Sequence, residues 1–253
     1  MPTDVEKLVQ YIRANFPPAI VPPSVQIGGL PSPFLHPSLC VLDAVYSAQQ
    51  HYSAVDDKKG GGVIGRYAGY RGISHTKGTS LEDGEMEDTL TDLINLIYAL
   101  GPESFAKDVV HNETKRLGKQ PKSEKGKPPF RSQVCLELAQ MLLTIEPASS
   151  YMSGLSKWAE EVDLENKAYK PRGKFYVKGI GYDTWHYLCM LAGNEDLVKP
   201  DVHITNFVKC VLGRKPTKPE IVGLLQEAAK ILGVPPKQLD NSIWNYMRNK
   251  KKR

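Results

Sequence analysis

Apolar residues in this chain recur at the spacing of α-helices, and this periodicity limits the possible folds more than any other feature. Seven segments repeat apolar residues at intervals of three and four, which places them on one face of a helix. The segments are 5–16, 41–48, 90–100, 134–145, 185–192, 221–232 and 239–247. No comparable set of segments alternates apolar and polar residues as half-buried strands do. The sequence therefore predicts an all-α fold.

Polar residues, glycines and prolines indicate where the helices begin and end. Thr3 and Glu6 have the spacing of a capping box at the start of the first helix, and Gly193 and Gly233 follow the ends of two later ones. Three stretches have the composition of connecting segments. They are the proline-rich 17–37, the glycine-rich and polar 56–80, and the low-complexity 118–129.

Composition and cysteine usage are those of a globular protein from a reducing compartment. Hydrophobic residues make up 41% and charged residues 24% of the 253 positions, which suits one large domain or two smaller ones. The four cysteines lie far apart and form no CxxC pair, so we expect free thiols and no zinc site. They are Cys40, Cys135, Cys189 and Cys210. Because the start lacks an apolar signal core and the uncharged stretch 14–42 holds seven prolines, we expect neither secretion nor a membrane helix.

Positive charge is concentrated in two segments. Residues 115–131 include seven basic residues and one acidic residue, and residues 248–253 include five basic residues and no acidic one. Because the whole chain has a net charge of +5, the remainder carries −6. Two basic segments on an acidic body suit a polyanionic partner, although an ordinary solvated loop and tail would have the same composition.

Two glycines, Gly179 and Gly181, flank Ile180 between two segments of helical character. Glycine has no Cβ, so its backbone can approach a ligand closely. The following helix is expected to begin just after Gly181, and a helix N-terminus favours an anion such as a nucleic-acid phosphate. An ordinary tight turn between helices is the alternative interpretation.

A second segment, Pro200–Ile204, places an aspartate at a helix start. Pro200 fixes the chain entering Asp201, and the helix that follows includes Ile204 and Val208. An N-capping role explains such an aspartate most simply. The alternative is a partly buried carboxylate that stabilises a developing positive charge or activates a water molecule.

Taken together, these segments resemble the endonuclease III-like members of the helix-hairpin-helix (HhH-GPD) superfamily of DNA glycosylases. The family pattern L-P-G-[VI]-G-x-K-T-A aligns with Val177–Trp185, and V-D-x-H-[VI] aligns with Pro200–Ile204. The 18 positions from Asp183 to Asp201 equal the family's spacing between its lysine position and its catalytic aspartate. Upstream, Val45–Gln50 resembles the family's L-L-S-A-Q-A helix end.

The resemblance implies a fold of two helical lobes. A six-helix barrel that includes the hairpin would span residues 37–195. The second, discontinuous lobe would combine residues 1–36 with residues 196–253. The cleft between the lobes would hold the active site with Asp201 at its mouth, as is common for ligand sites.

It also implies a DNA glycosylase of base excision repair that binds double-stranded DNA. Asp201 would stabilise the oxocarbenium-like state during hydrolysis of the N-glycosidic bond, and Gln49 would fill the space left by the flipped nucleotide. Tyr46 and Trp185 are candidates for stacking on the flipped base, with core packing as the alternative. The expected DNA-binding residues of the hairpin are Lys178, Gly179, Ile180, Gly181, Tyr182, Asp183 and Thr184.

Departures from the family pattern refine this expectation. Asp183 replaces the lysine that forms a Schiff base in bifunctional members, so a monofunctional enzyme without lyase activity is expected. The cysteines of the family's iron–sulfur cluster are absent, so no such cofactor is expected, while a monovalent cation at the hairpin is compatible with the pattern. Trp185 is larger than the family's alanine. We expect a monomer that is associated with DNA in the cytoplasm, nucleoid or nucleus.

Two further functions stay open from the sequence. A non-catalytic helix-hairpin-helix protein would bind DNA without releasing a base, and the changes at Asp183 and Trp185 favour it. A lyase or nuclease that uses Lys178 is the third option, although Lys178 stands at the family's proline position, where contact with phosphate is expected.

Overall fold

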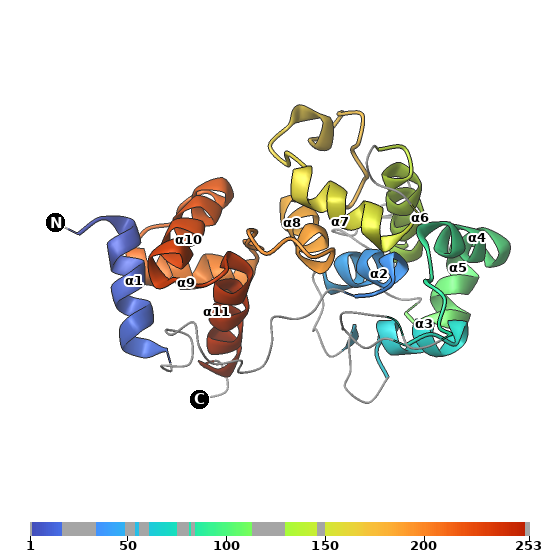
Figure 1. The fold of residues 1–253 in the computed structure, drawn as a ribbon, viewed down its shortest axis with the longest axis horizontal. Coiled ribbons are helices and arrows are strands. Elements are labelled where there is room, and N and C mark those ends of the chain that lie inside the picture. The colour runs from blue at the N-terminus through green and yellow to red at the C-terminus, as the bar shows by residue number, and fades with distance from the viewer. Residues whose placement is uncertain are drawn as a thin grey trace, which may run out of the picture. The chain divides into compact units, whose positions relative to one another are not determined.

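The computed structural model describes residues 2–16, 34–48, 54–55, 61–74, 81, 84–112, 130–145 and 150–250. Helices dominate these ranges and no β-strand occurs in them (Figure 1), which confirms the all-α class. The chain divides into two compact units. The terminal unit lies within Met1–Pro31 and Asn194–Arg253, and the central unit lies within Ser32–Gly193.

The terminal unit is built from α1 (Asp4–Asn15), α9 (Val202–Leu212), α10 (Lys218–Leu232) and α11 (Pro236–Lys250). Helix α1 packs on α9 and α10, and α11 packs on the same two helices. The capping box at the start of α1 is confirmed, because Thr3 accepts from the Glu6 backbone while the Glu6 carboxylate accepts from the Thr3 backbone. The predicted glycine end of α10 is also present, with Gly233 in the left-handed conformation.

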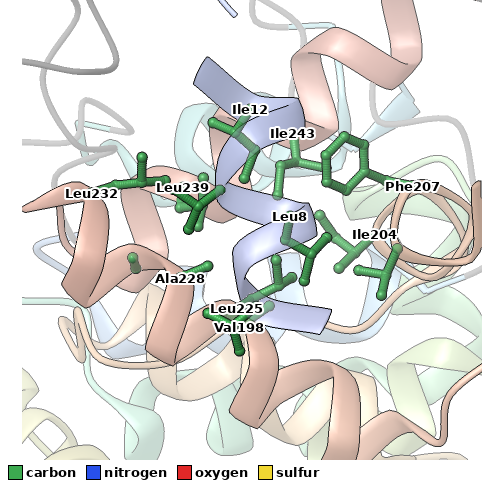
Figure 2. Packing of buried hydrophobic residues seen from close by; sticks show 14 of the residues in the cluster. Leu8, Ile12, Val198, Ile204, Phe207, Leu225, Ala228, Leu232, Leu239 and Ile243 are labelled. Atoms are coloured by element: carbon green, nitrogen blue, oxygen red, sulfur yellow. The ribbon is translucent and has the colours of Figure 1, made fainter. Parts of the chain in front are cut away.

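The apolar faces of these four helices meet in one core (Figure 2). Leu8 and Ile12 from α1 lie against Phe207 from α9 and Leu225 from α10, and all four side chains are buried. Ile243 contributes from α11. The spacing of three and four along each helix is therefore the cause of the packing, because it places these side chains on one face.

The central unit surrounds helix α2 (Pro37–Ser47), which packs against α3, α4, α6 and α8. Ten of the eleven α2 residues are buried, as expected for a helix enclosed on all sides. The other elements, in chain order, are α3 (Val63–Arg71), α4 (Leu90–Leu100), α5 (Pro102–Ser104), the π-helix η3 (Phe105–Val109), α6 (Arg131–Leu142), α7 (Met152–Glu161), the 3₁₀ turn η4 (Lys167–Tyr169) and α8 (Tyr182–Leu191).

One connector prediction was wrong in part. The glycine-rich stretch 56–80 contains helix α3, whose Val63, Ile64 and Tyr67 are buried. The helix is nine residues long and ends at Gly72 in the left-handed conformation. A helix this short, with two internal glycines, carries little of the periodicity on which sequence interpretation depends.

Candidate functional site

The turn of residues 177–181, which the sequence comparison aligns with the family's hairpin and which we call the hairpin, lies in the central unit directly before α8. Gly179 has φ +102°, a conformation that residues with a side chain rarely adopt. The Ile180 amide donates to the Val177 carbonyl at 3.1 Å, and the Ile180 side chain is buried. Gly181 is the N-cap of α8, so the predicted helix start after this glycine is confirmed.

The segment that precedes the hairpin differs from the expectation of helices on both sides. Helix α7 ends at Glu161, and the only helical residues between it and the hairpin form the short turn η4. The intervening loop is tightly built, because the Phe175 amide donates to the Ala168 carbonyl at 2.8 Å. A Cβ on Gly173 would lie 2.3 Å from that same carbonyl oxygen, so the loop passes its own backbone closely.

This loop holds a basic group that sequence analysis did not single out. Between Asn166 and Lys178 the chain has five basic residues and no acidic one. They are Lys167, Lys170, Arg172, Lys174 and Lys178. All are exposed except Lys170, which is half-buried. The signal that could have found this group is its local charge. Four acidic residues in 160–165 nearly cancel that charge when the two stretches are counted together.

The remaining hairpin residues differ in exposure. Lys178 and Gly181 are exposed, Tyr182 and Asp183 are half-buried, and Thr184 is buried. The Tyr182 ring lies 4.3 Å from the His186 ring between centroids, and its hydroxyl bonds with Glu165. Burial, and next the Glu165 carboxylate, raise the pKa of the Tyr182 hydroxyl. The surface open to a phosphate is thus the backbone around Gly181 together with the Lys178 side chain.

The two aromatic candidates for base stacking lie in the interior of the central unit. Tyr46 is fully buried, and burial raises the pKa of its hydroxyl well above the usual range. Trp185 is 3% exposed and meets the Trp158 and Tyr169 rings edge to face at 6.0 and 5.3 Å. These contacts are typical of core packing, which is the alternative interpretation of both side chains.

Asp201 lies in the terminal unit at the start of α9, as predicted. Its Oδ1 accepts from the backbone amides of His203 at 2.7 Å and Ile204 at 3.1 Å, so it is an N-cap. The Asp201 amide in turn donates to the Lys199 carbonyl at 2.7 Å. The residue is half-buried, and among the described residues its second oxygen, Oδ2, accepts no hydrogen bond. One oxygen thus fixes the carboxylate at the start of α9.

A second carboxyl group, Asp240 on α11, interacts with Asp201. Asp240 is 7% exposed, and its Oδ1 accepts from the Lys199 amide at 3.0 Å. Lys199 therefore links the two aspartates, because its carbonyl accepts from the Asp201 amide. Burial, and next the negative charge of Asp201, raise the pKa of Asp240 to about 8.

Sequence analysis missed Asp240, although a signal was present. Asp240 stands three, four and seven positions before Ile243, Trp244 and Met247, which places an acid on the apolar face of the last helix. A carboxyl group at such a position must be buried, paired or neutral. That argument would have marked Asp240 as a perturbed acid from the sequence.

Helix α11 also contacts the turn that follows Asp201. The His203 ring meets the Trp244 ring edge to face at 5.8 Å. The buried Nδ1 of His203 has no hydrogen-bond partner among the described residues. The Arg248 guanidinium also contacts the Trp244 ring and lies 5.1 Å from its centre. The start of α9 is thus held against α11 by a ring contact as well as by Asp240.

Gln49 lies outside the described residues, as do residues 115–129 and 251–253 of the two basic segments. The helix α2 that precedes Gln49 ends at Ser47. Buried Arg131 donates from a terminal guanidinium nitrogen to the Val45 carbonyl at 2.7 Å, near the end of α2. A cation at this point complements the negative end of the helix dipole.

Neither a metal-binding cluster nor a membrane-spanning helix occurs among the described residues. They contain no group of three or more histidine, cysteine, aspartate or glutamate side chains placed to hold a metal ion. None of their helices combines the length and apolar character needed to cross a membrane. The four cysteines are free thiols, and Cys210 alone among them is exposed.

Comparison with known proteins gives one match. Residues 34–248 match the family described as "Domain of unknown function (DUF8548)". No curated protein and no solved structure matches the chain.

Proposed function

The chain belongs to the DUF8548 family, and we propose that it is a monofunctional DNA glycosylase that uses Asp201. The observation that carries the proposal is the environment of the Asp201 carboxylate. Two backbone amides hold Oδ1 at the start of α9, and Oδ2 accepts no hydrogen bond from the described residues. A fixed carboxylate with one open oxygen can face a developing positive charge without moving.

In the proposed reaction, the bond between C1′ and the base nitrogen breaks, and the base leaves with the bonding electron pair. Positive charge then develops at C1′ and its ring oxygen, where the Asp201 carboxylate stabilises it. A water oxygen adds to C1′, and the proton that the water loses balances the charge on the departing base. The products are a free base and an abasic site.

Asp240 supports the assignment of the electrostatic role to Asp201. With a pKa of about 8, Asp240 is mostly protonated at neutral pH and adds no second negative charge beside Asp201. A buried carboxyl group with a strongly raised pKa beside a second carboxyl group is typical of sites that perform acid–base or electrostatic chemistry. Asp240 acts here as a positioning residue, through its bond to the Lys199 amide.

The hairpin supports the choice of DNA as the partner. Gly181 is exposed at the N-terminus of α8, where a phosphate can approach the backbone, and Lys178 adds a positive charge. Asp183 in place of an amine argues for hydrolysis without strand cleavage, because a carboxylate forms no Schiff base. Exposed Lys178 keeps a lyase among the alternatives, and borohydride trapping on abasic DNA would detect it.

A non-catalytic DNA-binding protein is the second candidate. One observation favours it, because N-capping of α9 accounts for Asp201 without any chemistry. Base release separates the two functions, since only a glycosylase generates alkali-labile sites.

The test uses labelled duplexes that carry alkylated, oxidised or mismatched bases, incubated with the protein and then split with and without hot alkali. We expect cleavage that depends on alkali and is lost with Asp201→Asn. Asparagine is as good an N-cap as aspartate, so this variant keeps the start of α9 while removing the charge. Alkali-independent cleavage would contradict monofunctional chemistry, and DNA binding without any cleavage would support the second candidate.

A further inference from the structure

A pocket of about 450 Å³ lies beside the hairpin, entirely within the central unit. Its size is in the usual range for small-ligand sites, about 300–1,000 Å³. Its walls come from the loop before the hairpin, from the hairpin itself and from the first turns of α8. The lining side chains used here are Tyr169, Lys170, Tyr176, Tyr182 and Trp185.

Aromatic rings dominate the walls, and two of them are open to solvent. Tyr176 is 39% exposed and Tyr182 is half-buried, whereas Tyr169 and Trp185 form the buried back of the pocket. The Lys170 ammonium lies 5.2 Å from the centre of the Tyr182 ring and 3.1 Å from a Glu165 carboxylate oxygen. Flat rings with a nearby cation are suited to a planar, electron-rich ligand such as a nucleobase.

The charge around the pocket extends well beyond it. Of the five basic residues between Asn166 and Lys178, Lys170 pairs with Glu165. The other four form no ion pair with any described acidic residue. They are Lys167, Arg172, Lys174 and Lys178. Several unpaired cations along one loop match the repeated phosphates of a strand better than the phosphate of one nucleotide.

The hairpin relates the pocket to a backbone phosphate. Gly179 and Gly181 line the pocket and also form the turn at the start of α8. A phosphate that approaches Gly181 therefore brings the base of the same nucleotide, or of the next one, to the pocket entrance.

We propose that this pocket receives one unpaired nucleobase of a DNA strand whose phosphates follow the basic loop 167–178. The inference rests on the proposed contact between the hairpin and DNA. It adds a base-binding pocket built from residues of the central unit, whereas Asp201 belongs to the terminal unit.

The experiment uses a short single strand of DNA with one 2-aminopurine, whose fluorescence is quenched when the base stacks on an aromatic ring. We expect the full-length protein to quench this base. Tyr176→Ala should weaken binding about 5- to 150-fold, because a stacked base contributes about that factor. Tyr176→Phe keeps the ring and should quench as the unchanged protein does. Tyr70→Ala removes an exposed tyrosine from α3 and should leave the quenching unchanged.

Two results would overturn the proposal. Undiminished quenching by Tyr176→Ala would show that the base stacks elsewhere. Equal competition by free deoxyadenosine monophosphate and by the strand, at equal nucleotide concentration, would assign the pocket to a mononucleotide instead.

The glycosylase function is tested separately on the same proteins. Quenching that depends on Tyr176, together with no base release on any lesion, would refute the glycosylase and leave the pocket supported. Base release together with quenching that does not depend on Tyr176 would refute base binding in the pocket and leave the glycosylase supported. Asp201→Asn should quench as the unchanged protein does.

Discussion

At the residue scale, Asp240 makes the stability of the protein depend on pH. Its pKa is about 8 in the folded protein, against 3.8 for a free aspartate. Between these values the unfolded chain has lost the proton that the folded chain keeps, so stability falls as pH rises. The greatest expected slope is about 1.4 kcal/mol per pH unit for one group.

Asp240→Asn should remove this pH dependence of stability, because the amide oxygen can still accept from the Lys199 amide but does not titrate. Urea unfolding of both proteins at pH 5 and pH 8 measures it. The unchanged protein should lose more stability than the variant over this interval. Parallel losses would show that Asp240 is ionised throughout and that the burial argument is wrong.

The two hairpin glycines offer a matched pair of substitutions. Gly179→Ala forces a side chain into φ +102° and should destabilise the protein by about 1–3 kcal/mol. Gly181 has φ −102° and open space where a Cβ would lie, so Gly181→Ala should cost less than about 1 kcal/mol. Its added methyl group would nevertheless obstruct the proposed phosphate, and DNA affinity should fall. Thermal unfolding and DNA titration of both variants test this, and unchanged affinity of Gly181→Ala would exclude phosphate contact at this turn.

At the scale of elements, helix α1 is attached to the terminal unit by its buried face. Leu8 is fully buried against α9 and α10, so Leu8→Ala should lower the free energy of unfolding by about 2–5 kcal/mol. Ile231 on α10 is 49% exposed, and Ile231→Ala is the control, with an expected change within about 0.5 kcal/mol. Similar losses in the two variants would mean that α1 does not pack as described.

The elements also show what a sequence can predict. Helices α1 and α10 were predictable because long apolar faces coincide with capping boxes. Helix α3 and the π-helix η3 were not, since each is short and its residues are buried by tertiary contacts rather than marked by periodicity. Asp201 was found as a helix start, but its interaction with Asp240 was not. That contact joins positions 39 residues apart and depends on how α9 and α11 pack.

At the scale of the whole molecule, the residues that the proposals use are divided between the two units. The hairpin, the basic loop and the aromatic pocket belong to the central unit, and Asp201 with Asp240 belongs to the terminal unit. The terminal unit itself joins α1 to the last three helices, which are distant in sequence. Because packing brings such separated segments together, the local motifs could be predicted from the sequence, whereas the packing of α1 with the last three helices could not.

The proposed role of Asp201 is measured by the single-turnover rate of base release by Asp201→Asn on the lesion that the unchanged protein processes. We expect a loss of about 100-fold or more, because the charge that stabilises the reacting sugar is gone. DNA affinity and thermal stability should be retained, since asparagine still caps α9. Base release by Asp201→Asn at the rate of the unchanged protein would refute the proposed role of Asp201.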